Sequence, residues 1–234
     1  MELRKTIVLV AAVLGVALTV RLALWQLDRA AQKVALQERA DARRALPPLP
    51  AAELAATEAQ VQEQIGRAVT LEGRWMADRT VYLDNRPMDG RTGFFVVTPL
   101  VLADGSVVAV QRGWLPRDFQ DRTRIAPPPT PVTPVQVTGR IAPALSRLFE
   151  IGTAASGPIR QNLDLAAFGR EVGRPLRPLA LLQEDAAPDG LQRHWPRPAA
   201  DVQKHYGYAF QWFALAALIM GLYVWFQLIR PRRR

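Results

Sequence analysis

Two groups of polar and aromatic residues stand where apolar stretches of the sequence meet polar ones. They are the residue types that could hold a metalloporphyrin. A neutral imidazole can ligate haem iron, aromatic faces can pack on the ring, and an arginine can neutralise a propionate. One group follows the first apolar stretch and the other opens the second: Trp25, Gln26 and Arg29, then His205, Tyr206, Tyr208, Gln211 and Trp212.

If the second stretch is helical, part of this group shares one side of the helix. The members of that predicted stripe are His205, Tyr208, Trp212 and Leu215. A simpler explanation is an interfacial belt, because Trp, Tyr and His side chains prefer the headgroup level of a membrane. Tyr223 and Trp225 would match such a belt at the opposite end. The residue types therefore permit a haem site without demonstrating one.

The apolar stretches themselves predict two transmembrane helices near the ends of the chain. Residues 6–27 and 206–229 are each long enough to cross roughly 30 Å of hydrocarbon as a helix. A cleaved signal peptide would end at small residues, whereas the first stretch passes into the bulky LALWQL segment at 22–27. We therefore predict an uncleaved anchor.

Basic residues at both ends predict the orientation. Arg4 and Lys5 precede the first span, and arginines follow the second. Lys and Arg close to spans stay on the cytoplasmic side, so both termini are predicted to be cytoplasmic and the central domain periplasmic, in the inner membrane of a bacterium. The predicted order is residues 1–5 in the cytoplasm, 6–27 as first span, 28–204 as periplasmic domain, 206–229 as second span and 230–234 as basic cytoplasmic tail.

Most of the formal net charge of +9 lies outside the central domain, where it indicates the membrane topology. Seven of the 30 bases and one of the 21 acids lie outside residues 28–204, which leaves the central domain about +3. Nucleic-acid binding is therefore not expected.

Residue types that are missing or scarce exclude several functions. Cysteine is absent, which rules out disulfides, thiolate metal sites and covalent c-type haem, and the four methionines are too scattered for a copper(I) cluster. No nucleotide-binding glycine motif, G-x-S-x-G or H-E-x-x-H is present. A Ser-His-Asp hydrolase would need His194 or His205, so we predict that the protein is not an enzyme.

The sequence of the central domain predicts a largely antiparallel β-sheet with a few short helices. The predicted fold class is therefore membrane α+β. The first span should continue as a helix until PPLP at 47–50 stops it. A short helix is predicted at 51–65, another at 162–173 and an extended proline-rich connection at 125–134. Runs enriched in β-branched and aromatic residues and separated by turns predict strands at 67–75, 80–87, 92–102, 106–115, 134–141 and 177–184.

Five segments resemble the surfeit-locus protein 1 family, in the same order and over nearly the whole chain. They are WQLDR at 25–29, VYLDNRP at 81–87, GFFVVTPL at 93–100, VQRGWLP at 110–116 and HYGYAFQWFALA at 205–216. The resemblance implies a two-span assembly factor for haem-copper terminal oxidases. It also implies transient binding of haem a, with the catalytic subunit 1 and possibly haem a synthase as partners.

The resemblance assigns the haem iron to His205. Trp25 and Trp212 could pack on the porphyrin and Arg29 or Arg21 could neutralise propionates, so the predicted cofactor site comprises His205, Trp25, Arg29, Tyr208 and Trp212. Two alternatives stay open. One is a cofactor-free membrane scaffold that stabilises an oxidase assembly intermediate, and the other is a periplasmic hydrolase with a Ser or Asp near His194.

We also make predictions for other residues that match the family segments. Asn85 and Arg86 form either a turn with a solvated arginine or a functional pair, and Gly113 is expected to serve a bulge or bend at a strand end. The next residue, Trp114, is expected in the core rather than on a ligand.

Two residues of the first span depart from the family pattern. Arg21 either reaches the outer interface or faces the second helix. Ala23 stands where family members often have Gly, which leaves close helix packing less assured.

Overall fold

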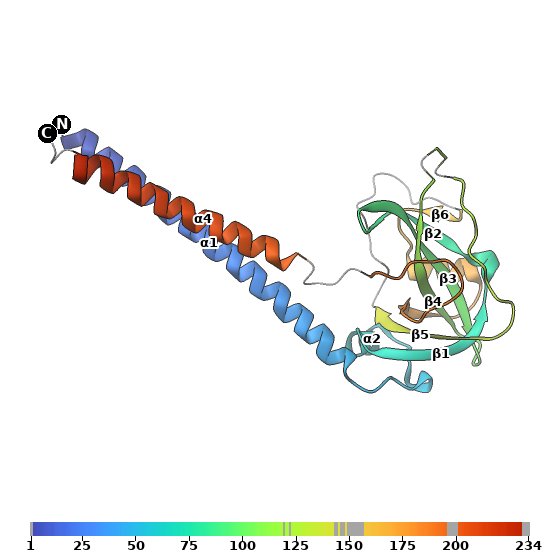
Figure 1. The fold of residues 1–234 in the computed structure, drawn as a ribbon. Coiled ribbons are helices and arrows are strands. Elements are labelled where there is room, and N and C mark those ends of the chain that lie inside the picture. Colours follow the sequence, from blue (N-terminus) through green and yellow to red (C-terminus); the bar gives the residue numbers. More distant parts are fainter. Residues whose placement is uncertain are drawn as a thin grey trace. The chain divides into compact units, whose positions relative to one another are not determined.

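The chain folds into two units, which we describe separately (Figure 1). A computed structural model describes residues 2–118, 120–121, 123–142, 145, 148, 157–195 and 201–230. The helical unit comprises Met1–Arg39 and Arg197–Arg234, and the sheet unit comprises Ala40–Pro196.

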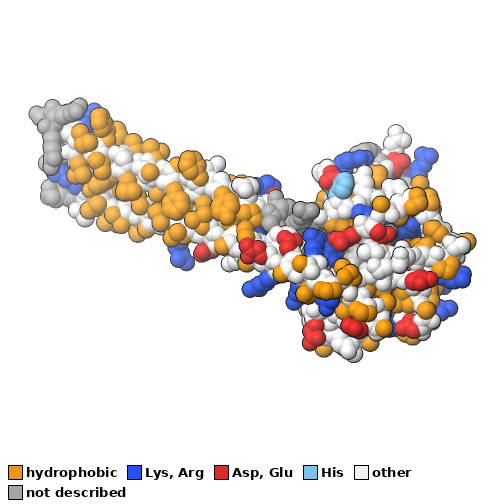
Figure 2. All heavy atoms as spheres, turned by 60° about the horizontal axis from the view of Figure 1, so that its bottom comes forward, with side chains coloured by type: hydrophobic (Ala, Val, Ile, Leu, Met, Phe, Trp, Pro, Cys, Tyr) orange, Lys and Arg blue, Asp and Glu red, His pale blue; other side chains and the backbone are white. Residues whose placement is uncertain are grey.

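Two long helices make up the helical unit. They are α1 (Glu2–Arg44) and α4 (Val202–Tyr223), and α4 is followed by a π-helical turn, Val224–Ile229. Only 11% and 6% of their most apolar windows are buried, and hydrophobic side chains cover most of the face seen in Figure 2. A core helix of a soluble protein would be mostly buried, so this exposure fits two membrane spans at the ends of the chain.

Small residues line the seam between the two antiparallel helices. The buried members are Thr19, Ala23, Ala30, Ala209 and Ala216. A Cβ added at Gly15 would lie 3.4 Å from Ile219 Cδ1, and small side chains let helix backbones approach closely in a membrane. Ala23 is fully buried, so alanine in place of the family's glycine still allows close packing there.

Seven strands form one sheet in the order β1-β5-β7-β4-β3-β2-β6. β1 also pairs with β3, which closes β1, β5, β7, β4 and β3 into a barrel. The pairs β4–β7 and β2–β6 are parallel and the others antiparallel, so the predicted largely antiparallel sheet is confirmed. The strands are β1 (Ala68–Trp75), β2 (Val81–Met88), β3 (Arg91–Leu102), β4 (Val107–Pro116), β5 (Val135–Ala142), β6 (Ile159–Arg160) and β7 (Leu176–Gln183).

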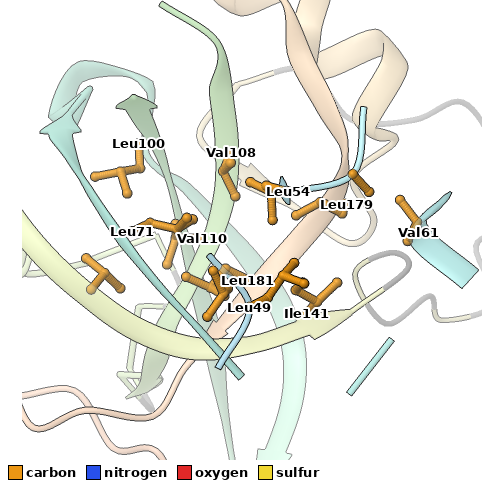
Figure 3. Packing of buried hydrophobic residues seen from close by; sticks show 13 residues of the cluster. Leu49, Leu54, Val61, Leu71, Leu100, Val108, Val110, Ile141, Leu179 and Leu181 are labelled. Carbon is orange, nitrogen blue, oxygen red and sulfur yellow. The ribbon is translucent and has the colours of Figure 1, made fainter. Parts of the chain in front are cut away.

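Strands β3, β4 and the middle of β7 are buried on both faces, whereas β1 and β5 each have a more exposed face. Alternate residues such as Val108, Val110, Leu179 and Leu181 pack together in one cluster, which Figure 3 shows between the strands. Their neighbours on β4 and β7 pack in a second cluster with Phe168 of α3. Strands covered on both faces have continuous runs of apolar residues in their sequences, which is the pattern of β3 and β4.

Short helices cover parts of this sheet. α3 (Leu165–Val172) begins where the Asp164 side chain accepts a hydrogen bond from the Ala167 amide, and ends at Gly173 with φ of 71°. The prediction of one helix over 51–65 is wrong. Thr57 caps a new helix, so the segment divides into a 3-10 turn, Ala51–Glu53, and α2, Glu58–Gln64.

Candidate functional site

His205 lies in the first turns of α4 and contacts α1 directly. Its Nδ1 atom is 2.7 Å from the amide oxygen Oε1 of Gln26. An amide oxygen only accepts hydrogen bonds, so Nδ1 carries the proton and donates. The lone pair of the neutral imidazole is then on Nε2, for which the described residues provide no hydrogen bond. A donor at Nδ1 and a lone pair at Nε2 are what an imidazole needs to ligate a metal with a fixed ring orientation.

The four residues of the predicted stripe all lie on α4, where their spacing places them on one side of the helix, but they differ in burial. His205 and Trp212 lie on the partly buried side together with Ala209 and Ala216. Tyr208 is 53% exposed and Leu215 is 40% exposed, so both lie farther from the seam than His205 and Trp212. The predicted stripe therefore has a partly buried half and an exposed half.

The predicted residues of α1 lie on its exposed side. Trp25 is 55% exposed and borders a hollow of about 710 Å³ on the surface of α1, together with Arg21 and Asp28. Arg29 is exposed, and its guanidinium donates to Gln32 Oε1 at 3.1 Å. Arg21 is also exposed rather than packed in the seam, which agrees with the interfacial alternative for this residue. The structure thus joins His205 to Gln26 and leaves Trp25 and Arg29 accessible.

The matching arginine of β2 is buried by a bulge in the strand. The register shifts between Leu83 and Arg86, and Asn85 at the shift has φ of 59°. A bulge re-aims the side chains that follow it, and Arg86 is only 2% exposed. Its Nη2 donates to the Gln161 carbonyl at 2.7 Å. The solvated arginine considered from the sequence is therefore wrong, and burial lowers the pKa of Arg86 although Asp84 partly offsets this.

A second bulge buries Arg112 of β4. The register shifts where Gly113 and Gln111 oppose adjacent residues of β3, so Arg112 is the extra residue. Its guanidinium is 3.2 Å from Asp189, donates to the Thr130 hydroxyl at 2.7 Å, and stacks 4.9 Å from the Trp75 ring centre. Burial lowers the pKa of Arg112, and the Asp189 carboxylate opposes that shift.

Gly113 and Trp114 hold the chain around residues 189–195 against the sheet. A Cβ at Gly113 would lie 2.6 Å from Leu191 Cβ and 2.9 Å from the Gln192 carbonyl. Trp114 is fully buried, exchanges backbone hydrogen bonds with Gln192 and donates from Nε1 to the Arg86 carbonyl at 2.8 Å. The bulge expected at Gly113 lies at the preceding residue, Arg112, and the core position of Trp114 is confirmed.

His194 forms an exposed pair with Asp89, Nδ1 to Oδ2 at 2.6 Å. A hydrolytic triad also needs a serine hydroxyl at the other ring nitrogen, and no contact in the described part of the chain places one there. Within the same residues, no three His, Asp or Glu side chains are grouped closely enough to hold a metal ion.

Sequence comparisons identify the family of the chain. The model of the SURF1 family matches residues 13–217. That match runs through both helices and the whole sheet unit. The chain belongs to the SURF1 family.

Named relatives agree with this membership. A SURF1-like protein of Rickettsia bellii (strain RML369-C) is 27% identical over 217 residues, which cover 87% of this chain and 84% of the relative. A SURF1-like protein of Dictyostelium discoideum is 40% identical over 48 residues, 20% of this chain and 18% of that protein. SURF1 proteins are assembly factors, so membership implies a role in oxidase assembly for this SURF1-family chain.

Two residues of these contacts were missing from the predicted site. Gln26 belongs to the matched WQLDR segment, but its link to His205 depends on how α1 and α4 are rotated against each other. Asp189 lies in a loop more than 70 residues from Arg112, and no motif marks it.

Proposed function

We propose that this SURF1-family protein carries haem a transiently during assembly of a haem-copper oxidase, with His205 Nε2 as the ligand of the haem iron. The observation that supports this is the hydrogen bond from His205 Nδ1 to Gln26, because it fixes the tautomer that leaves Nε2 able to ligate. Bound haem a would supply the iron centre. The protein contributes the oriented imidazole and the surfaces around it.

Neighbouring residues supply the other requirements of a carrier. The exposed Trp25 ring offers an apolar surface for the porphyrin, and Arg29 and Arg21 offer positive charge for propionates. Trp212 and Tyr208 extend the aromatic surface on α4. A single histidine ligand suits a carrier, which must release its cargo, better than two strong ligands would.

The positively charged ends support a placement in the bacterial inner membrane with both termini in the cytoplasm and the sheet unit in the periplasm. His205 then lies at the periplasmic end of α4. Catalytic subunit 1 of the oxidase is the proposed recipient, and haem a synthase the proposed source.

A scaffold that binds no cofactor is the competing proposal. The same His205–Gln26 hydrogen bond favours it in one respect, because polar side chains also join helices inside membranes without any ligand. In that case the pair only holds α1 against α4.

Purification from cells that synthesise haem a separates the two proposals. Haem a per protein, read from the visible spectrum, is expected to fall at least about tenfold in His205→Ala, because the iron loses its ligand. His194→Ala is the matched control and should keep its haem. Wild-type protein that co-purifies with subunit 1 but carries no haem would favour the scaffold and overturn the carrier.

A further inference from the structure

A cavity of about 530 Å³ lies in the sheet unit. It is bounded by the first half of β5, by the proline-rich segment before β5 and by the loop that follows β7. Apolar side chains form most of its walls, among them Trp75, Pro129, Pro131, Val135, Ala187 and Pro188. The cavity therefore suits an apolar group of a ligand.

One carboxylate in this lining has no cationic partner. Asp185 is partly buried, and its Oδ1 accepts a hydrogen bond from the Thr138 amide at 2.9 Å. Its Oδ2 accepts from the side-chain amide of Gln183 at 3.3 Å. Both donors are uncharged, and no Lys, Arg or His in the described part of the chain forms an ion pair with Asp185. The two hydrogen bonds orient the carboxylate and leave further acceptor sites on both of its oxygens.

The other charged side chains of the lining already form an ion pair. Arg112 and Asp189 are 3.2 Å apart, and each is at most 6% exposed. Arg193, which lies outside the lining, also contacts Asp189. Burial lowers the pKa of Arg112 and Asp189 opposes that shift, whereas Asp185 takes no part in it. One arginine against two aspartates gives the lining a net charge of −1, and Asp185 is the residue that provides it.

A cation on an apolar stem matches both properties of this cavity. A ligand that covers a partly buried carboxylate without a counter-charge removes water from it and replaces none of the lost interactions, which is costly. A lysine side chain supplies both parts in one residue, since its methylene stem packs on apolar surface while its ammonium keeps polar partners. The three donors of the ammonium can use the acceptor sites left on Asp185, whereas the planar fork of arginine needs two oxygens open side by side.

The neighbouring strand indicates that this lysine belongs to a protein chain. The Thr138 carbonyl accepts from the Glu184 amide, so the backbone of Thr138 faces the β7 side of β5. Gln136, two residues earlier, lines the cavity and its backbone faces the same side. The pairing of β5 with β7 ends at Gly139, so no strand in the described part of the chain covers the edge at Gln136. An open strand edge can pair with an extended segment of another protein.

We propose that the cavity binds a lysine side chain of a partner protein. The ammonium forms an ion pair with Asp185, and the methylene stem packs against the proline and alanine walls. The chain on either side of the lysine extends along the edge of β5 at Gln136. This interaction does not depend on haem, because it uses neither His205 nor any other residue proposed for haem binding.

Selection from a random decapeptide library displayed on phage tests the proposal. The target is the full-length protein in phosphatidylcholine nanodiscs. Empty nanodiscs and nanodiscs that contain the Asp185→Asn variant remove all other binders, since this variant keeps an amide oxygen for the Thr138 N–H but loses the charge. We expect the remaining sequences to share a lysine with uncharged neighbours.

Synthetic peptides then separate the charge from the apolar contact. Replacing the shared lysine by norleucine keeps an apolar stem and removes the ammonium. With wild-type protein this change should weaken binding at least about tenfold, because hydrogen bonds to a charged group are lost. With the Asp185→Asn variant, the lysine and norleucine peptides should bind alike.

Two further variants locate the binding surface. Ala186→Trp should abolish binding of the lysine peptide by filling the cavity, and Ala186 is exposed, so this change tests the proposal even if Asp185→Asn fails to fold. Glu63→Gln, which removes an exposed acid of α2 outside the cavity, is the control and should bind as wild type. Three results would each overturn the proposal: failure to enrich any lysine peptide, an equal effect of norleucine on wild type and Asp185→Asn, or equal binding by wild type and Ala186→Trp.

Discussion

The residues that carry the family resemblance have opposite environments in the two units. In the sheet unit, Arg86, Arg112 and Trp114 are at most 2% exposed and bonded to distant parts of the chain. In the helical unit, Trp25 and Arg29 are exposed and His205 has one described hydrogen bond. This difference indicates that the matched residues of the two units have different structural roles. The sheet motifs pack inside the sheet unit, whereas Trp25 and Arg29 of the helix motifs are exposed.

The largest expected effect comes from removing the carboxylate between the buried arginines. Asp189→Ala leaves Arg112 without its buried partner, and breaking a buried ion pair on one side costs about 3–5 kcal/mol. Chemical denaturation should report this loss in the free energy of unfolding of the sheet unit. Glu72→Ala, on an exposed position of β1, is the control, and a similar small effect for both variants would show that the buried pair does not stabilise the fold.

Two glycine substitutions, one in each unit, give a smaller expected effect on stability. Gly113→Ala should cost about 1–3 kcal/mol, because its Cβ would overlap Leu191 and the Gln192 carbonyl. Gly207→Ala in α4 has no atom within 4 Å of the added Cβ and should be neutral or slightly stabilising. Thermal unfolding of both variants measures the contrast. If they behave alike, the motif glycine of the sheet is not needed for close approach.

The Gln26→Leu substitution tests a contact of the helical unit. It removes the acceptor that orients His205, and loss of such a contact typically weakens metal binding about 10–100-fold. Haem a titration should show this weakening while the free energy of unfolding changes little, since one such hydrogen bond between membrane helices is worth about 0.6 kcal/mol. Unchanged haem affinity would mean that Gln26 does not position the ligand.

The smallest effect is expected at the surface of the sheet unit. Hydrogen bonds from Ser106 and then Arg177 hold the pKa of Asp104 below its ordinary value, so its contribution is complete above about pH 4 and is lost as the pH falls through the lowered pKa. Asp104→Asn should therefore cost less than about 1 kcal/mol at pH 7. The gap to wild type should narrow as the pH falls below about 4, and a gap that stays constant there would argue against this charge.

Local patterns in the sequence were enough to predict most elements. Apolar length predicted both spans, and enrichment in β-branched and aromatic residues predicted the barrel strands because turn residues separate these runs. The two-residue β6 was missed, since so short a strand leaves no periodicity to detect.

Long-range geometry could not be predicted in the same way. Barrel closure depends on the pairing of β1 with β3 and on β7 entering between β5 and β4, contacts between segments far apart in sequence. Bulges at Asn85 and Arg112 reverse the faces that alternation alone assigns, so the burial of Arg86 was not evident. Likewise, the His205–Gln26 contact depends on the rotation of two helices, which composition does not specify.

The most direct test of the central claim is the visible absorbance of haem a in purified His205→Ala, recorded as purified and after addition of haem a with and without imidazole. We predict that the variant carries little haem a as purified and that added haem a gives the spectrum seen in wild type and in His194→Ala only when imidazole replaces the missing side chain. A His205→Ala protein that carries as much haem a as wild type without added imidazole would contradict the assignment of His205 as the ligand.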